Sequence, residues 1–247
     1  MKHLRWQIVV GVLMIALTVL LGIVHYEFFH DAHTFLFYMA LDVAFIPVQV
    51  LLVTLIISNI LAYREKRAML NKLNMVIGAF FSELGTRLLK DFSAIDSDVS
   101  KIAEHLKIEN EWTDKKFAEV RLCLQSHHYN VDYSAAAFAS MRELLVKERG
   151  FLLRLLENQN LLEHESFTDL LWAVFHITEE LTSRSSLQNL PATDSKHLAG
   201  DIRRAYRLLV LQWFDYMKHL KHDYPYLFSL AIRTNPFNPD ARITVMN

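Results

Sequence analysis

Two long apolar runs without a charged residue constrain this chain more than any other feature of its sequence. Ile8–Val24 has 17 residues and Val43–Ala62 has 20. A helix needs about 20 residues, with about 17 as a lower limit, to cross the roughly 30 Å hydrocarbon core of a bilayer. A core helix of a globular protein would carry polar residues at helical spacing, and these runs do not. We therefore expect two transmembrane helices, over about 8–24 and about 35–62, joined by an outer loop at 25–34.

Basic residues flank the predicted spans on one side only. Lys2 and Arg5 precede the first span, whereas the loop at 25–34 contains neither Lys nor Arg. Basic residues return after the second span, at Arg64, Lys66, Arg67 and Lys72. The positive-inside rule then predicts a multi-pass protein of the cell inner or plasma membrane with both termini in the cytoplasm. No A-x-A-like cleavage site follows the first run, so we expect an anchor and not a signal peptide.

Polar side chains in the second span are the sharpest candidates for a role inside the membrane. Asp42 lies about two turns inside the span if the helix begins near Phe35, but at the outer interface if the apolar core ends near Leu61. An Asp at the centre of a bilayer costs about 2.5–3.5 kcal/mol and usually has a function. Gln49, seven residues on, lies on the same helix face.

Three hydroxyl residues complete this set. Thr54 and Ser58 form a separate polar stripe on the second span. Thr18 of the first span lies at a depth similar to that of Asp42, and we expect a hydrogen bond between the two. If several copies assemble, the candidates for lining a pore or for polar contacts within the membrane are Asp42, Gln49, Thr54, Ser58 and Thr18.

The predicted outer loop is rich in histidine. It contains His25, His30 and His33 together with Glu27 and Asp31. Such a group is able to bind zinc or copper, or to respond to pH. The spacing does not define a four-ligand geometry, so the three histidines are a weak metal candidate.

The remainder of the chain, 63–247, is expected to be a cytoplasmic all-helical domain with an extended tail at 235–247. Roughly 185 residues suffice for a domain with its own core. Helix starts are marked by capping residues at Thr113 or Asp114, Asp132 or Ser134, Ser166, and Asp194 or Ser195, and by Pro225 in the first turn of the last helix.

The start of this domain continues the second membrane helix. Residues 63–91 contain no Pro, and apolar residues recur at steps of three and four. Gly78, Ser82 and Gly85 form a stripe of small residues along this segment. Because small residues let two backbones approach closely, we expect helix packing here, within one subunit or between subunits.

The sequence lacks the common catalytic and cofactor motifs. Glycine-rich phosphate loops and the G-x-S-x-G hydrolase motif do not occur, and the single cysteine, Cys123, excludes a cysteine-based metal site. With 26 Lys and Arg against 27 Asp and Glu, there is no electrostatic case for a nucleic-acid partner. We expect no enzyme activity, no cofactor and a buried, unreactive Cys123.

A few weaker clusters remain. His176 with Glu179 and Glu180 forms part of a metal site if the three share a helix face. The others are His219, His222 and Asp223, the pair His127 and His128, and the basic group Arg203, Arg204 and Arg207. For each of them an ordinary exposed or salt-bridged surface is the simpler interpretation.

Together these observations predict an all-α protein, a two-helix transmembrane hairpin whose second helix continues into a cytoplasmic helical bundle. The expected function is that of a non-enzymatic, membrane-anchored interaction or scaffold protein. Its partners would be the lipid bilayer and either further copies of itself or other membrane subunits. The alternatives are an oligomeric channel or flux unit lined by the second span, and a membrane sensor of metal, pH or a small ligand.

Overall fold

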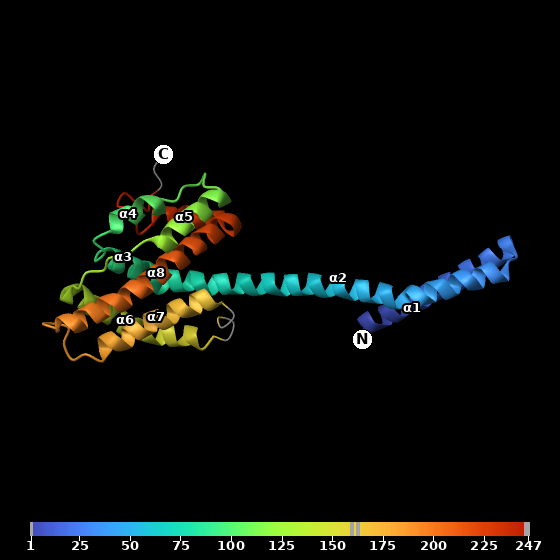
Figure 1. Cartoon of the computed structure of the whole chain (residues 1–247), viewed down its shortest axis with the longest axis horizontal. Helices are drawn as coiled ribbons and strands as arrows, with labels where there is room; N and C mark the ends of the chain where they lie inside the picture. Colours follow the sequence, from blue (N-terminus) through green and yellow to red (C-terminus); the bar gives the residue numbers. More distant parts are fainter. Residues whose placement is uncertain (1, 159–160, 162–163, 245–247) are drawn as a thin grey trace. The chain divides into compact units, whose positions relative to one another are not determined.

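The computed structural model describes residues 2–158, 161 and 164–244, and this part of the chain is all-helical (Figure 1). The predicted all-α class is confirmed. Within the described ranges no residue belongs to a named strand, and an isolated antiparallel bridge joins Asp96 to Val131. The chain divides into two compact units, Met1–Lys66 and Arg67–Asn247.

The first unit contains α1 (Lys2–Phe29) and the first part of α2 (Ala32–Phe80). His30, with a left-handed φ of 48°, and Asp31 separate the two helices. The Asp31 carboxylate accepts hydrogen bonds from the backbone amides of His33 and Thr34, both at 3.1 Å, and so caps α2. The break between the two helices is therefore shorter than the outer loop expected at 25–34. The segment contains no Gly or Pro to end a helix early, and the Asp31 cap allows a very short turn.

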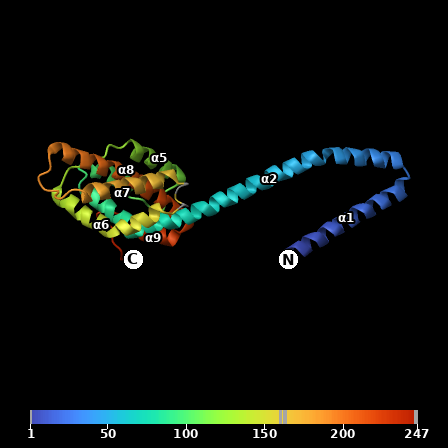
Figure 2. The same cartoon turned by 90° about the horizontal axis from the view of Figure 1, so that it is seen from below.

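Both helices of the first unit carry large apolar side chains on all faces. The stretch Trp6–Phe28 reaches a mean hydropathy of 2.7 and the stretch His33–Ser93 one of 2.4, each in a window with no buried residue. Figure 2 shows α1 and the start of α2 leaving the same turn. By length and composition, both are able to cross a membrane.

The second unit is a helical bundle built around α8. It contains the end of α2, the π-helix η1 (Phe81–Gly85), α3 (Thr86–Ser93), α4 (Val99–Ala103), the 3-10 turn η2 (Glu104–Leu106), α5 (Asp114–Ser126), α6 (Ala135–Leu156), α7 (Glu165–Thr182), α8 (Ala192–Asp223) and α9 (Pro225–Arg233). Helix α8 packs against α3, α5, α7 and α9. Its buried apolar residues recur at steps of three and four: Leu198, Ile202, Ala205, Leu209, Trp213, Met217 and Leu220.

Capping residues mark several helix starts of the second unit correctly. The Thr113 hydroxyl accepts from the Lys116 amide at 3.3 Å, and the Ser134 hydroxyl accepts from the Ala137 amide at 3.4 Å. Pro225 is the first residue of α9, as expected.

Two predicted starts are wrong. Helix α7 is capped by the His164 ring and not by Ser166, because His164 Nδ1 accepts from the Phe167 amide at 3.2 Å. Helix α8 begins at Ala192, ahead of the expected cap at Asp194 or Ser195, and Asp194 binds Arg184 instead.

The predicted tail is not helical between 235 and 244, and residues 245–247 lie outside the described part. It packs onto the bundle. The Asn235 side chain donates to the Leu106 carbonyl at 2.7 Å, and the Phe237 ring lies 5.4 Å from that of Trp213.

The helix expected over 63–91 corresponds to the end of α2, η1 and α3, with an unforeseen π-helix in the middle. The Phe81 carbonyl accepts both the backbone amide and the hydroxyl of Thr86, the latter at 2.8 Å. A Cβ on Gly85 would stand 2.6 Å from a Phe81 ring carbon and 2.8 Å from one of Phe80. The π-helix therefore folds two buried rings over a position where only glycine fits.

Candidate functional site

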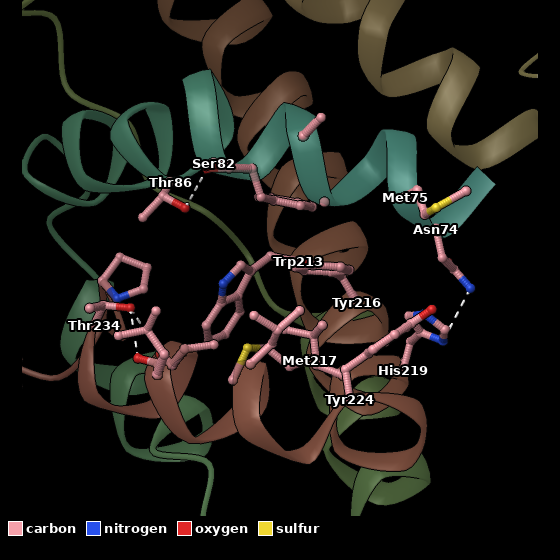
Figure 3. A pocket seen from close by; sticks show the side chains of 18 residues that line it. Asn74, Met75, Ser82, Thr86, Trp213, Tyr216, Met217, His219, Tyr224 and Thr234 are labelled. Atoms are coloured by element: carbon pink, nitrogen blue, oxygen red, sulfur yellow. Dashed lines mark hydrogen bonds between the residues drawn. The ribbon is translucent and has the colours of Figure 1, made fainter. Parts of the chain in front are cut away.

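A pocket of about 540 Å³ opens in the second unit between the end of α2, η1, α8 and α9. Its walls are mainly apolar, with side chains such as Met75, Trp213, Met217, Leu220, Leu227 and Leu230. Figure 3 shows Met75 and Ser82 across the pocket from Met217 and Tyr224. The volume lies within the roughly 300–1,000 Å³ of small-molecule sites.

Small residues create this space. Gly78, Ala79 and Ser82 line the pocket from α2 and η1, and Ala231 lines it from α9. Side chains of ordinary size at these positions would occupy the cavity. A π-helix often accompanies a functional site, and η1 contributes Phe81 and Ser82 to the wall.

One group of polar side chains lies around His219 at one end of the pocket, and Ser82, Thr86 and Thr234 lie at the other end (Figure 3). The Asn74 amide nitrogen is hydrogen-bonded to His219 Nδ1 at 3.1 Å, and Asp223 Oδ2 lies 2.8 Å from the same nitrogen. Burial lowers the pKa of His219, and the nearby Asp223 carboxylate partly opposes this shift. The net shift favours the neutral form of the His219 ring.

The three small residues predicted to support helix packing do not share one environment; they are Gly78, Ser82 and Gly85. Gly78 and Ser82 line the pocket, and Gly78 lies against Tyr216 of α8. Gly85 instead lies under the rings of Phe80 and Phe81.

The intramembrane candidates all lie on the two helices of the first unit. Asp42, Gln49, Thr54 and Ser58 are exposed on α2, and Thr18 is exposed on α1. The expected hydrogen bond between Thr18 and Asp42 is wrong. The Thr18 hydroxyl donates to the Met14 carbonyl at 3.0 Å, one turn back on its own helix, where an acceptor is always within reach.

The outer histidines do not form the metal-capable cluster of this structure. His25 is on α1, His30 is in the turn and His33 is in the first turn of α2. In the described residues, the group of three potential ligands that does converge is Glu180, His197 and Asp201 of the second unit. The sequence suggests His176 with Glu179 and Glu180, and the structure adds His197 and Asp201, which the sequence analysis does not include. The repeated His-x-x-x-acid spacing, at 176–180 and again at 197–201, was the available signal.

The remaining candidates lie on the surface of the second unit. Arg203, Arg204 and Arg207 line a broad hollow of about 1,270 Å³, together with His127 and His128. Arg204 pairs with Asp201 at 2.9 Å, and His222 is exposed. Cys123 is exposed, so the expectation that it is buried is wrong. It follows Leu122, which also faces outward, and only Val120 and Leu124 of this turn are buried.

The chain is similar to proteins of one family. A family model described as "MJ1433, N-terminal helical domain" matches residues 1–61, and one described as "Uncharacterized protein MJ1433, C-terminal helical domain" matches residues 69–233. The uncharacterized protein MJ1433 of Methanocaldococcus jannaschii is 45% identical over 238 residues, which are 96% of either chain. No solved structure matches the chain.

Proposed function

The chain belongs to the MJ1433 family, and we propose that it is an integral membrane protein whose helical domain binds an uncharged, elongated apolar molecule. The pocket between α2, α8 and α9 carries this proposal. The membrane anchor and the ligand site rest on different observations and need separate tests.

Support for the anchor comes from the exposed apolar helices of the first unit. Large side chains such as Leu13, Ile15, Leu51 and Ile56 are each more than half exposed. Exposed apolar patches of this extent are unfavourable in water but favourable in lipid. The basic residues at both ends of the first unit indicate a hairpin with both termini in the cytoplasm.

Membrane fractionation tests the anchor. The full chain should resist alkaline carbonate extraction, and a carboxyl-terminal tag should be protected from protease in intact cells and cleaved once they are permeabilised. A tag that is cleaved in intact cells would refute the orientation. Extraction of the protein by carbonate would refute the anchor itself.

The composition of the pocket indicates the ligand class. Its apolar walls favour a hydrocarbon body, and the polar group around His219 and Asn74 offers hydrogen bonds to one head group. The Asp223 carboxylate beside His219 disfavours an anionic head. A hydroxyl or carbonyl group is the best match, since a neutral imidazole and an amide both donate and accept.

Quenching of Trp213 fluorescence tests ligand binding. Trp213 lines the pocket and is 4% exposed. A brominated long-chain alcohol added to the detergent-solubilised full chain should quench Trp213 saturably, and the corresponding fatty acid should bind more weakly. The saturable component should disappear in Trp213→Phe, because the other tryptophans do not line the pocket.

A pair of neighbouring exposed residues supplies the matched variants. Ser82 lines the pocket and Glu83 does not, and both are exposed in η1. Ser82→Trp should fill the cavity and weaken binding by at least about tenfold, whereas Glu83→Trp should bind like the unmodified chain. Equal binding by both variants would exclude the pocket as the site.

A second candidate function is that of a subunit in a larger membrane assembly, as a non-enzymatic scaffold. The specific observation is that no residue in the apolar windows of the first unit is buried, so both helices retain lateral surfaces for partners. The mass of the detergent-extracted particle tests this. A ring-shaped oligomer whose bilayer conductance changes in Asp42→Asn would instead favour a channel. A monomer without conductance would exclude both.

A further inference from the structure

A second cluster of side chains joins α7 to α8 away from the apolar pocket. His176 and Glu180 lie one turn apart on α7, and His197 and Asp201 lie one turn apart on α8. Asp201 Oδ2 is 3.3 Å from His176 Nε2 and 3.3 Å from His197 Nε2. Glu180 Oε1 lies 3.9 Å from His176 Nε2, and its Oε2 lies 3.7 Å from His197 Nε2. One ligand atom each of Glu180, His197 and Asp201 therefore lies within 4.8 Å of the other two, and His176 approaches the same Asp201 oxygen from α7.

The side chain of Asp201 lacks part of the hydrogen bonding that a buried carboxylate requires. Its side chain is only 3% exposed, and among the described residues its Oδ2 has no hydrogen-bond partner. A buried carboxylate oxygen is costly unless it is paired or coordinates a metal. Both histidine nitrogens face this oxygen without completing a hydrogen bond.

The distances suit a small tetrahedral ion. With bonds of about 2.0–2.2 Å, neighbouring ligand atoms of a tetrahedral zinc site lie roughly 3.3–3.6 Å apart. The two contacts of Asp201 Oδ2 at 3.3 Å match this spacing, and the contacts of Glu180 at 3.7 and 3.9 Å, each made by a different oxygen, are longer.

An arginine side chain donates to one oxygen of each carboxylate. Arg184 Nη1 donates to Glu180 Oε2 at 2.7 Å, and Arg204 Nη2 donates to Asp201 Oδ1 at 2.9 Å. Such contacts orient ligands in metal sites. They leave Asp201 Oδ2 facing both histidines, while Glu180 faces His176 with Oε1 and His197 with Oε2. Glu179, which the sequence also suggested, does not take part, because it pairs with Arg149 at 3.0 Å.

We propose that His176, Glu180, His197 and Asp201 bind one divalent transition-metal ion of the zinc class. Two nitrogen ligands favour zinc, cobalt or nickel over magnesium or calcium, which prefer oxygen. The hollow of about 1,270 Å³ lined by His176, His197 and Asp201 gives an ion access from solvent. The bound ion links α7 to α8, so it stabilises the second unit and leaves the apolar pocket unchanged.

Metal titration of the full chain tests the site. Chelator-treated, detergent-solubilised protein should bind one Zn²⁺ per chain and unfold at a higher temperature with Zn²⁺ than without it. Co²⁺ should give the intense visible absorption of a tetrahedral site, and Mg²⁺ should have no effect. His197→Gln and Asp201→Asn should each weaken Zn²⁺ binding by at least about tenfold.

Two variants serve as controls. His30→Gln alters the outer histidines and His105→Gln alters an exposed histidine elsewhere in the second unit, and both should bind Zn²⁺ normally. If the four residues form ion pairs only, His197→Gln will change stability but Zn²⁺ will not bind, and the proposal is overturned. Binding that survives His197→Gln and is lost in His30→Gln would overturn it as well.

Discussion

A Cβ atom on Gly78 would stand 2.9 Å from the hydroxyl oxygen of Tyr216, which approaches from α8. The Tyr216 ring is held in place, because it stacks on Phe81 at 5.4 Å with an interplanar angle of 13°. The contact between α2 and α8 therefore depends on the missing side chain of Gly78.

Enlarging this position should destabilise the protein. Gly78→Leu should cost about 1–3 kcal/mol, because the added atoms must displace the stacked Tyr216 ring. At Gly150, by contrast, the nearest atom to an added Cβ is the flexible end of Arg154, at 3.6 Å. Gly150→Ala should stabilise the chain by up to about 1 kcal/mol through helix propensity. Thermal unfolding of the solubilised full chain checks both, and an unchanged midpoint in Gly78→Leu would contradict the packing described.

Removing the buried hydroxyl of Tyr206 should raise the stability of the protein. Tyr206 is fully buried, and its hydroxyl has no hydrogen-bond partner in the part of the chain that the structure describes. Tyr206→Phe keeps the ring contacts with Phe92 and Tyr129 and should raise stability by about 1 kcal/mol. In Tyr129→Phe, the lost bond to the Leu124 carbonyl should lower stability by about 0.5–1.5 kcal/mol. A lower midpoint for Tyr206→Phe would show that its hydroxyl is paired.

The partly buried imidazole of His219 should make the protein sensitive to acid. Burial lowers the pKa of His219 below its ordinary 6.5, despite the facing Asp223 carboxylate and with a small contribution from His222. The unfolded chain therefore takes up protons first as the pH falls through 6.5, and stability declines from there toward the lower pKa of the folded state.

Substitution of single histidines separates the contribution of His219 to the acid sensitivity from that of other residues. Burial also lowers the pKa of His127, so part of the decline will remain in any His219 variant. His219→Gln should show a shallower loss of thermal stability on acidification than the unmodified chain, and His222→Gln, an exposed neighbour, should not. Equal slopes for all three proteins would rule out His219 as a source of the acid sensitivity.

A bidentate ion pair between Arg121 and Asp215 joins α5 to α8. Arg121 Nε lies 2.8 Å from Asp215 Oδ1, and Arg121 Nη2 donates to Asp215 Oδ2 at 3.0 Å. Both side chains are about 40% exposed, so a double-mutant cycle should give a coupling of only about 0.5–1 kcal/mol. Arg121→Lys should lose most of it, because an ammonium group cannot make both contacts. The exposed pair Lys218–Asp114 should give a smaller coupling, and the reverse order would contradict this ranking.

Local patterns were sufficient to predict the helical class and several helix starts. Thr113 and Ser134 cap helices because their hydroxyls reach an amide three residues on, a contact that depends only on neighbouring residues. The cap at His164 is not apparent from the sequence because an imidazole rarely has this role. Ser166 has the residue type of a cap, but it lies inside α7 and its hydroxyl donates to Gln212 Oε1, 46 residues away, at 3.3 Å.

The candidate sites were harder to predict because each depends on distant segments. The apolar pocket requires Gly78 and Ser82 to face Trp213 and Met217 of α8, more than 100 residues later. His176 and Glu180 were visible as a half-site, but the matching pair on α8 could be placed only once the antiparallel packing of α7 and α8 was known. No pattern in the sequence indicated the π-helix.

The π-helix lets one continuous helical segment present two different faces to its neighbours. An α-helix turns by roughly 100° per residue, so one extra residue in a turn rotates everything that follows by about this angle. The buried residues on the two sides of η1 are Leu73, Ile77 and Phe80 before it and Leu88, Leu89 and Phe92 after it. Deleting a single residue from Phe81–Gly85 would leave one of these two sets facing water, whichever of the five residues is deleted. This turn therefore has to keep its number of residues as well as the glycine at position 85.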